Sequence, residues 1–145
     1  MTINRAATLL AAFALSACAT LPAPEQPPQP PPVASENTAV VALVQNARAD
    51  VSAGRLATAA SNLERALRIE PRNPALWHEL ARVTLHQGKP AEAAEFANKS
   101  NTFAGDNAAL RAANWRLIGQ ARTQNGDHTG AEAAFERAAQ IERQR

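Results

Sequence analysis

Three glycines recur at nearly constant spacing and divide the second part of the chain into similar units. Gly54, Gly88 and Gly126 are separated by 34 and 38 residues. The same steps relate further residues, namely Ala59, Ala93 and Ala131, and the larger step relates Trp77 to Trp115. Self-similarity at such a period indicates a repeat architecture, in which each unit buries its apolar face only against its neighbours.

Each unit has the pattern of two short helices joined by a tight turn. In the middle unit, Trp77 and Leu80 have helical spacing, and Gly88 then interrupts the pattern before Ala93 continues it. Gly88 suits the left-handed residue that ends a helix, and Pro90 suits a first helical turn. Alanine dominates the apolar residues, tyrosine is absent, and no segment alternates with a period of two. The sequence therefore predicts an all-α fold.

The order of Trp, Leu and a small residue, then Gly, then Ala, resembles the tetratricopeptide repeat, which has one helical hairpin per repeat. The resemblance implies an α-solenoid of three hairpins, with repeats at residues 40–73, 74–107 and 112–145. The matching residues are Ala66 and Pro71 in the first repeat, Trp77, Leu80, Ala81, Gly88 and Ala93 in the second, and Trp115, Gly119, Gly126, Ala131, Phe135 and Ala138 in the third.

The chain departs from the repeat pattern at three places. Leu43 replaces the aromatic residue near the start of the first repeat, and Ser100 and Gly105 replace the late Ala and Pro of the second. Four additional residues separate the second and third repeats. Since four residues are about one helical turn, they preserve the buried face. We predict that Gly105 and Asp106 form a stop and a cap, and that the extra turn begins a helix over 107–125.

The first 17 residues have the features of a secretory signal. Arg5 precedes an apolar run from Ala6 to Leu15, and the sequence Leu-Ser-Ala-Cys ends at Cys18, the only cysteine. This ending resembles the lipobox of bacterial lipoproteins, which implies cleavage before Cys18 and its lipidation. Because Ala19 rather than Asp follows, the resemblance also implies the periplasmic face of the outer membrane. The alternative is an ordinary signal, or a buried cysteine.

A proline-rich linker is predicted from residue 18 to residue 38. Seven of the ten prolines lie between Pro22 and Pro32. Proline at this density forbids helix and favours extended polyproline II. We therefore expect a disordered, semi-rigid tether between the lipid anchor and a repeat domain over 39–145. A proline-motif ligand for another protein is the alternative.

Stacked repeats form a concave groove, and mapping the family's groove positions onto this chain gives a set with three arginines and two histidines. Its polar members are Arg48, His78, Arg82, His86, Arg116, Gln120, Thr123 and Gln124, and its apolar members are Val44, Val51 and Leu85. None of these eleven positions is a carboxylate. We expect the groove to bind an acidic or carboxylate-bearing segment, or else to be solvated without a dedicated ligand.

The carboxylate clamp of chaperone-binding tetratricopeptide domains does not carry over to this chain. Its positions would be Val44, Arg48, Glu79, Ala113 and Leu117, and only Arg48 among them is basic. Glu79 is one of several carboxylates whose helical spacing predicts a mostly exposed position.

The sequence offers no catalytic or cofactor-binding constellation. It has no Gly-x-Ser-x-Gly elbow, phosphate-binding glycine loop or dinucleotide fingerprint. His78 and His86 lie two helical turns apart without further ligands, which argues against a metal site, and His128 is expected in the last turn as a surface residue. A net charge of +2 does not indicate that the protein binds nucleic acid. We predict a protein without enzymatic activity, cofactor or metal.

The last helix has an apolar face that a following helix would normally cover in a repeat array. The face consists of Ala131, Ala134, Phe135, Ala138 and Ile141. One interpretation is that a face so rich in alanine needs little covering by another helix. Alternatively, it is a contact for a homodimer or for a partner.

The layout as a whole resembles the lipoprotein activators of bifunctional, class A peptidoglycan synthases in pseudomonads and their relatives. The resemblance implies an interaction module that contacts the periplasmic part of a class A penicillin-binding protein and activates it. The alternative function is a pilotin-like or assembly adaptor for a pilus, secretin or other outer-membrane complex. A purely structural spacer, without a saturable partner, is a third class.

Overall fold

The computed structural model describes residues 33–144, which form six α-helices and no strand. The helices are α1 (Thr38–Ser52), α2 (Leu56–Ile69), α3 (Pro74–His86), α4 (Pro90–Phe103), α5 (Ala108–Gln124) and α6 (His128–Arg143). The predicted signal, Cys18 and most of the predicted tether lie outside the described residues. Within the described part of the chain, no helix has the length and apolar character needed to span a membrane.

Short polar residues begin four of the helices. The side chains of Asn37, Asn73, Asn107 and Asp127 accept hydrogen bonds from backbone N–H groups in the first turns of α1, α3, α5 and α6. Asn107, rather than the predicted Asp106, therefore caps α5. His128 is the first residue of α6 and not part of the turn before it.

The extra turn lies where the sequence predicts it. Helix α5 has 17 residues and α3 has 13, a difference of four residues or about one turn. Gly105 ends the preceding segment with a positive φ of 52°. The insertion between the second and third repeats is therefore accommodated as a longer helix, without a disordered loop.

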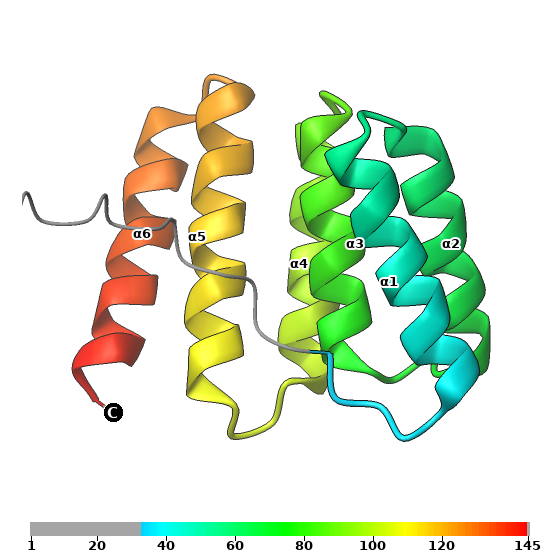
Figure 1. Ribbon diagram of the computed structural model, residues 1–145. Coiled ribbons are helices and arrows are strands. Elements are labelled where there is room, and N and C mark those ends of the chain that lie inside the picture. Colours follow the sequence, from blue (N-terminus) through cyan, green and yellow to red (C-terminus); the bar gives the residue numbers. More distant parts are fainter. Residues whose placement is uncertain (1–32, 145) are drawn as a thin grey trace, which may run out of the picture.

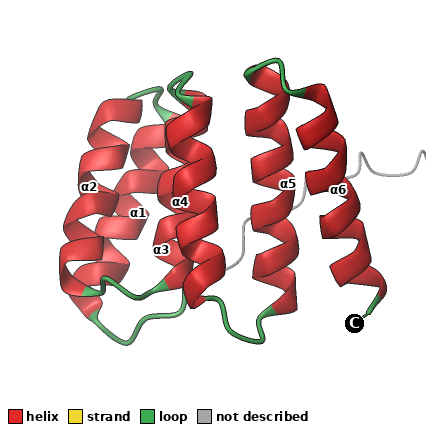
Figure 2. Ribbon diagram, turned by 180° about the vertical axis from the view of Figure 1, so that it is seen from behind, coloured by secondary structure: helices red, strands yellow, loops and turns green. Residues whose placement is uncertain are grey.

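Consecutive helices pack against each other throughout residues 38–143. Helices α1 and α2, α3 and α4, and α5 and α6 form antiparallel hairpins, and α2 and α4 also contact the helices that follow them (Figure 1). Seen from behind, α2 and α4 lie in front of α1 and α3 (Figure 2). This succession of local contacts is that of a helical solenoid and confirms the predicted fold class.

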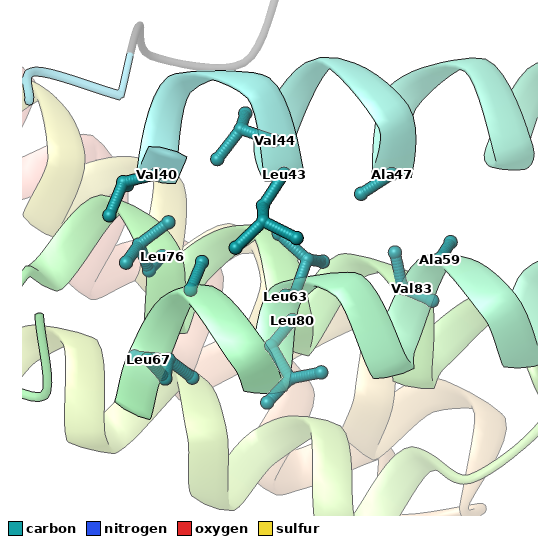
Figure 3. Close-up of a cluster of buried hydrophobic side chains, with 11 residues drawn as sticks. Val40, Leu43, Val44, Ala47, Ala59, Leu63, Leu67, Leu76, Leu80 and Val83 are labelled. Carbon is teal, nitrogen blue, oxygen red and sulfur yellow. The ribbon is translucent and has the colours of Figure 1, made fainter. Parts of the chain in front are cut away.

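Two apolar clusters form the core, and α3 contributes to both. The first cluster joins α1, α2 and α3 and contains Leu63 and Leu76, with exposures of 1% and 0% (Figure 3). The second joins α3, α4, α5 and α6 and contains Leu85 and Ile118. Nine of the 13 residues of α3 are buried. Helix α3 is therefore the central helix of the domain.

The last residues of the predicted tether contact the repeats. Val33 packs against the first cluster, Ser35 Oγ donates to Glu70 Oε1 at 2.6 Å, and Asn73 Nδ2 donates to the carbonyl oxygen of Ala34 at 3.1 Å. The expectation of a disordered segment up to residue 38 is therefore wrong for residues 33–37. An apolar side chain and two hydrogen bonds hold them at the turn between α2 and α3.

We expect Gly88→Ala to lower the free energy of unfolding by about 1–2 kcal/mol, because φ at this residue is +75° and an L side chain disfavours that conformation. Gly88→Asn is the matched control and is expected to lose less, since asparagine tolerates the left-handed region. Urea unfolding of the soluble chain over residues 19–145 measures both. Equal stability of the alanine variant and the natural chain would contradict the assignment.

Candidate protein-binding groove

A pocket of about 170 Å³ opens between α1 and α3. Its apolar wall comes from Val44, Ala47 and Val51 of α1, Leu63 of α2 and Val83 of α3. Arg48, Glu79, Arg82 and His86 supply its polar groups. The structure thus brings together five of the predicted groove residues around an apolar cavity large enough for a small side chain, namely Val44, Arg48, Val51, Arg82 and His86.

A buried carboxylate holds the two arginines of the pocket. Glu79 Oε1 accepts from Arg48 Nη2 at 2.7 Å, and Glu79 Oε2 accepts from Arg82 Nη1 at 2.8 Å. The Glu79 side chain is 5% exposed, whereas those of Arg48 and Arg82 are 47% and 33% exposed. We call these three residues the arginine–glutamate triad. The expectation of an exposed Glu79, and of a groove without a carboxylate, is therefore wrong.

The triad keeps a net positive charge and unused hydrogen-bond donors. Two guanidinium groups and one carboxylate sum to +1. Each guanidinium has five N–H groups, and in residues 33–144 Glu79 is the only side chain that accepts from either. An incoming carboxylate or carbonyl oxygen can therefore bind to guanidinium groups whose orientation is already fixed.

His78 does not line the groove, because it lies in the core. It is 4% exposed, and its Nδ1 is 2.7 Å from Asn114 Oδ1 on α5. Asn114 Nδ2 donates to Ser100 Oγ on α4 at 2.8 Å, and Ser100 Oγ donates to the carbonyl oxygen of Pro74 at 2.7 Å. This buried polar network connects α3, α4 and α5 at the junction between the second and third repeats. The prediction of His78 as a groove residue is wrong.

The network fixes the tautomer of His78, and burial lowers the pKa of its imidazole. Because Asn114 uses its Nδ2 as donor to Ser100 and Asn101, its Oδ1 must accept, so His78 Nδ1 carries the proton. Desolvation by burial lowers the pKa of His78 below 6.5, and nearby Arg82 lowers it further. The hydrogen bond with Asn114 and the charge of Glu79 act in the opposite direction. His78 is therefore neutral at pH 7.

The remaining polar residues of the predicted groove lie on α5 and do not line the pocket, and Leu85 of α3 is buried in the second core cluster. Arg116 is exposed and forms an ion pair with Glu142 of α6. Gln120 and Gln124 are also exposed. These three side chains are accessible to a partner, but the structure does not bring them together with Arg48 and Arg82.

Two functional features escaped the sequence reasoning, and one of them left a signal. Ser100 stands where the repeat pattern has alanine, and its hydroxyl is part of the buried network, with an exposure of 0%. A polar residue at a small, buried position is a signal for a hydrogen-bond partner across the interface. The burial of Glu79 had no comparable signal, because glutamate on a helix is usually solvated.

Comparison with known proteins agrees with the repeats described above. Models of the tetratricopeptide repeat match residues 50–114 and 112–145, and the second match coincides with the predicted third repeat. The chain belongs to the tetratricopeptide-repeat family. No match was found among curated protein sequences.

A solved structure resembles the domain over nearly its full length. The globular C-terminal domain of P. aeruginosa LpoP has 39% sequence identity to this chain and a TM-score of 0.70. The likeness covers 72% of this chain and 99% of that chain. At this identity and coverage, the repeat domain belongs to the same group as the LpoP domain, and the likeness extends beyond the general repeat fold.

We expect Asn114→Ala to lower the free energy of unfolding by about 2–3 kcal/mol, because it leaves the buried N–H group of His78 without an acceptor. Asn98→Ala, at an exposed position of α4, is the control and is expected to change stability by less than about 0.5 kcal/mol. Urea unfolding measures both. A change at Asn114 as small as that at Asn98 would show that the network does not stabilise the domain.

We also expect the domain to lose stability as the pH falls from about 7.5 to about 5.5. Below pH 6.5 the unfolded chain protonates His78 while the folded chain, in which burial lowers the pKa of His78, does not. Protons therefore favour unfolding in this range. In His78→Asn, which retains an N–H donor for Asn114, the pH dependence should be smaller. Parallel pH dependences of the two proteins would contradict the assigned pKa shift.

Proposed function

We propose that this protein is a non-catalytic, lipid-anchored interaction module that activates a class A peptidoglycan synthase from the periplasmic face of the outer membrane. The main support is the likeness to the LpoP domain at 39% identity over 99% of that chain. The resemblance of the whole layout to lipoprotein activators of such synthases agrees with it. The proposed anchor is Cys18, with residues 19–32 as the spacer between lipid and repeats.

The groove supports a specific mode of binding. An apolar side chain of the synthase enters the pocket between α1 and α3, and an adjacent carboxylate or carbonyl oxygen binds to Arg48 and Arg82. Glu79 holds both guanidinium groups before the partner arrives, which reduces the conformational entropy lost on binding. His86, at the exposed edge of the same pocket, adds a further polar contact.

The direct experiment measures glycan polymerisation and crosslinking by a purified class A synthase from the same organism. The soluble chain over residues 19–145 is expected to stimulate it and to reach saturation. If the soluble chain neither binds nor stimulates the synthase, activation is wrong. The adaptor for a pilus, secretin or other outer-membrane complex would then be favoured.

The role of the groove is tested by replacing the whole triad with apolar residues of similar size, Arg48→Met, Glu79→Leu and Arg82→Met. Complete replacement of a buried ion pair is often tolerated, whereas removal of one partner leaves a buried charge unpaired. We therefore expect a folded variant whose half-saturating concentration is raised at least about tenfold.

Arg116→Met, which removes an exposed cation outside the pocket, is the matched control and is expected to change the half-saturating concentration little. Circular dichroism and urea unfolding confirm that both variants are folded. A folded triad variant with unchanged half-saturation would show that the synthase binds elsewhere on the domain.

A further inference from the structure

A second hollow lies on the other side of α3, and residues of α2, α3 and α4 line it. Figure 2 shows α2 and α4 in front of α3. It has a volume of about 270 Å³ and is lined by Glu64, Leu67 and Arg68 of α2, Trp77 and Leu80 of α3, and Phe96 of α4. At 3.6 residues per turn, Trp77 and Leu80 point away from the side of α3 that carries Glu79, Arg82 and His86. This hollow is therefore separate from the groove described above.

Aromatic rings form one wall of the hollow and continue along α4. The rings of Trp77 and Phe96 are 5.8 Å apart between centroids and tilted by 40°. Phe96, Lys99 and Phe103 follow each other at steps of three and four residues, so they share one face of α4. We call this surface, from the hollow to Phe103, the α2–α4 face.

Two cations converge on the ring of Phe103 at the end of this face. Arg72 Cζ is 5.7 Å and Lys99 Nζ is 5.3 Å from the ring centroid. Cations at this distance are attracted to the ring, which holds them in place while their N–H groups remain available to an anion. In residues 33–144, neither Arg72, Lys99 nor Arg68 at the rim of the hollow forms an ion pair.

The charges and the shape of the face together define its ligand. Among the residues of the hollow and of its cationic end, three cations stand against one carboxylate, that of Glu64. Glu92, on the same side of α4, is paired with Lys89 at 3.7 Å. A purely basic patch would suit any polyanion, but an apolar hollow with aromatic walls beside the cations also requires an apolar group of matching size. At a membrane surface the anionic headgroups cover the acyl chains, whereas a peptide presents an apolar side chain and carboxylates on neighbouring residues.

We propose that the α2–α4 face is a second docking surface, which binds an acidic peptide segment of a partner protein. One aliphatic or aromatic side chain of the segment enters the hollow and packs against the rings of Trp77 and Phe96. Flanking carboxylates bind to Arg68, Arg72 and Lys99. The domain then has a binding surface on each side of α3, and this second surface does not depend on the function proposed for the first.

The two tryptophans provide a direct test with an internal control. Trp77 lines the hollow and donates its Nε1–H to the carbonyl oxygen of Pro71 at 2.9 Å, whereas Trp115 packs against the second core cluster. The full chain, labelled with ¹⁵N and held in non-ionic detergent micelles, gives two indole signals. The probe is a synthetic peptide with one leucine flanked by aspartates, and a second peptide has asparagines in place of the aspartates.

We expect the aspartate peptide to shift the Trp77 indole signal to saturation with a Kd below about 1 mM, and to leave the Trp115 signal unchanged. The asparagine peptide should bind at least about tenfold more weakly, because the cations lose their ionic partners. The proposal is overturned if the aspartate peptide leaves Trp77 unchanged at this concentration, or if the two peptides bind equally well.

Variants distinguish binding at the α2–α4 face from general electrostatic attraction between the peptide and the protein. The double variant Arg72→Gln and Lys99→Gln should weaken binding of the aspartate peptide at least about tenfold. Arg137→Gln, on the exposed side of α6, removes charge elsewhere and should leave it unchanged. Equal binding by the double variant and the natural chain would overturn the proposal. So would binding to phosphatidylglycerol vesicles that depends on Arg72 and Lys99 while the peptide fails to bind, since the face would then recognise a membrane.

Discussion

Helix α3 has to pack on nearly all sides, and the rest of the domain follows from this constraint. Nine of its 13 residues are buried, and its apolar residues belong to two clusters that together include all six helices. Its charged and polar residues therefore need partners inside the protein. Glu79 forms ion pairs with Arg48 and Arg82, and His78 forms a hydrogen bond with Asn114. The need of Glu79 for a partner explains the position of Arg48 on α1, and the need of His78 explains the buried amide of Asn114 on α5.

The same packing explains why both proposed binding surfaces lie beside α3. On one side its residues form the wall of the pocket with α1, and on the other Trp77 and Leu80 form the floor of the hollow between α2 and α4. The cations of each surface are held by a neighbour, Glu79 in one case and the ring of Phe103 in the other. Such prior fixation favours binding, because less conformational entropy is lost when the partner arrives.

The ends and lengths of the helices were predictable because residues close to each end cause them. Gly88 and Gly126 have the positive φ that ends a helix, Asn37 caps α1, and the four inserted residues lengthen α5. The groove was predicted less well. Arg48, Arg82 and His86 do meet at one pocket, but His78 and Glu79 are buried, and Arg116 pairs with α6. The groove positions of a family indicate on which face of a helix a residue lies, but they do not indicate which neighbouring side chains cover that residue.

The sequence by itself therefore determined the number of helices in each repeat, their order and their ends, since glycine, proline and asparagine act within a few residues of their own position. Only the tertiary structure decided which polar residues are exposed. The burial of Glu79 depends on its contact with Arg48 of α1, 31 residues earlier in the sequence. The burial of His78 depends on its contact with Asn114, 36 residues later. The free energy of these side chains is set by solvation and by partners from other helices, which no helical periodicity encodes.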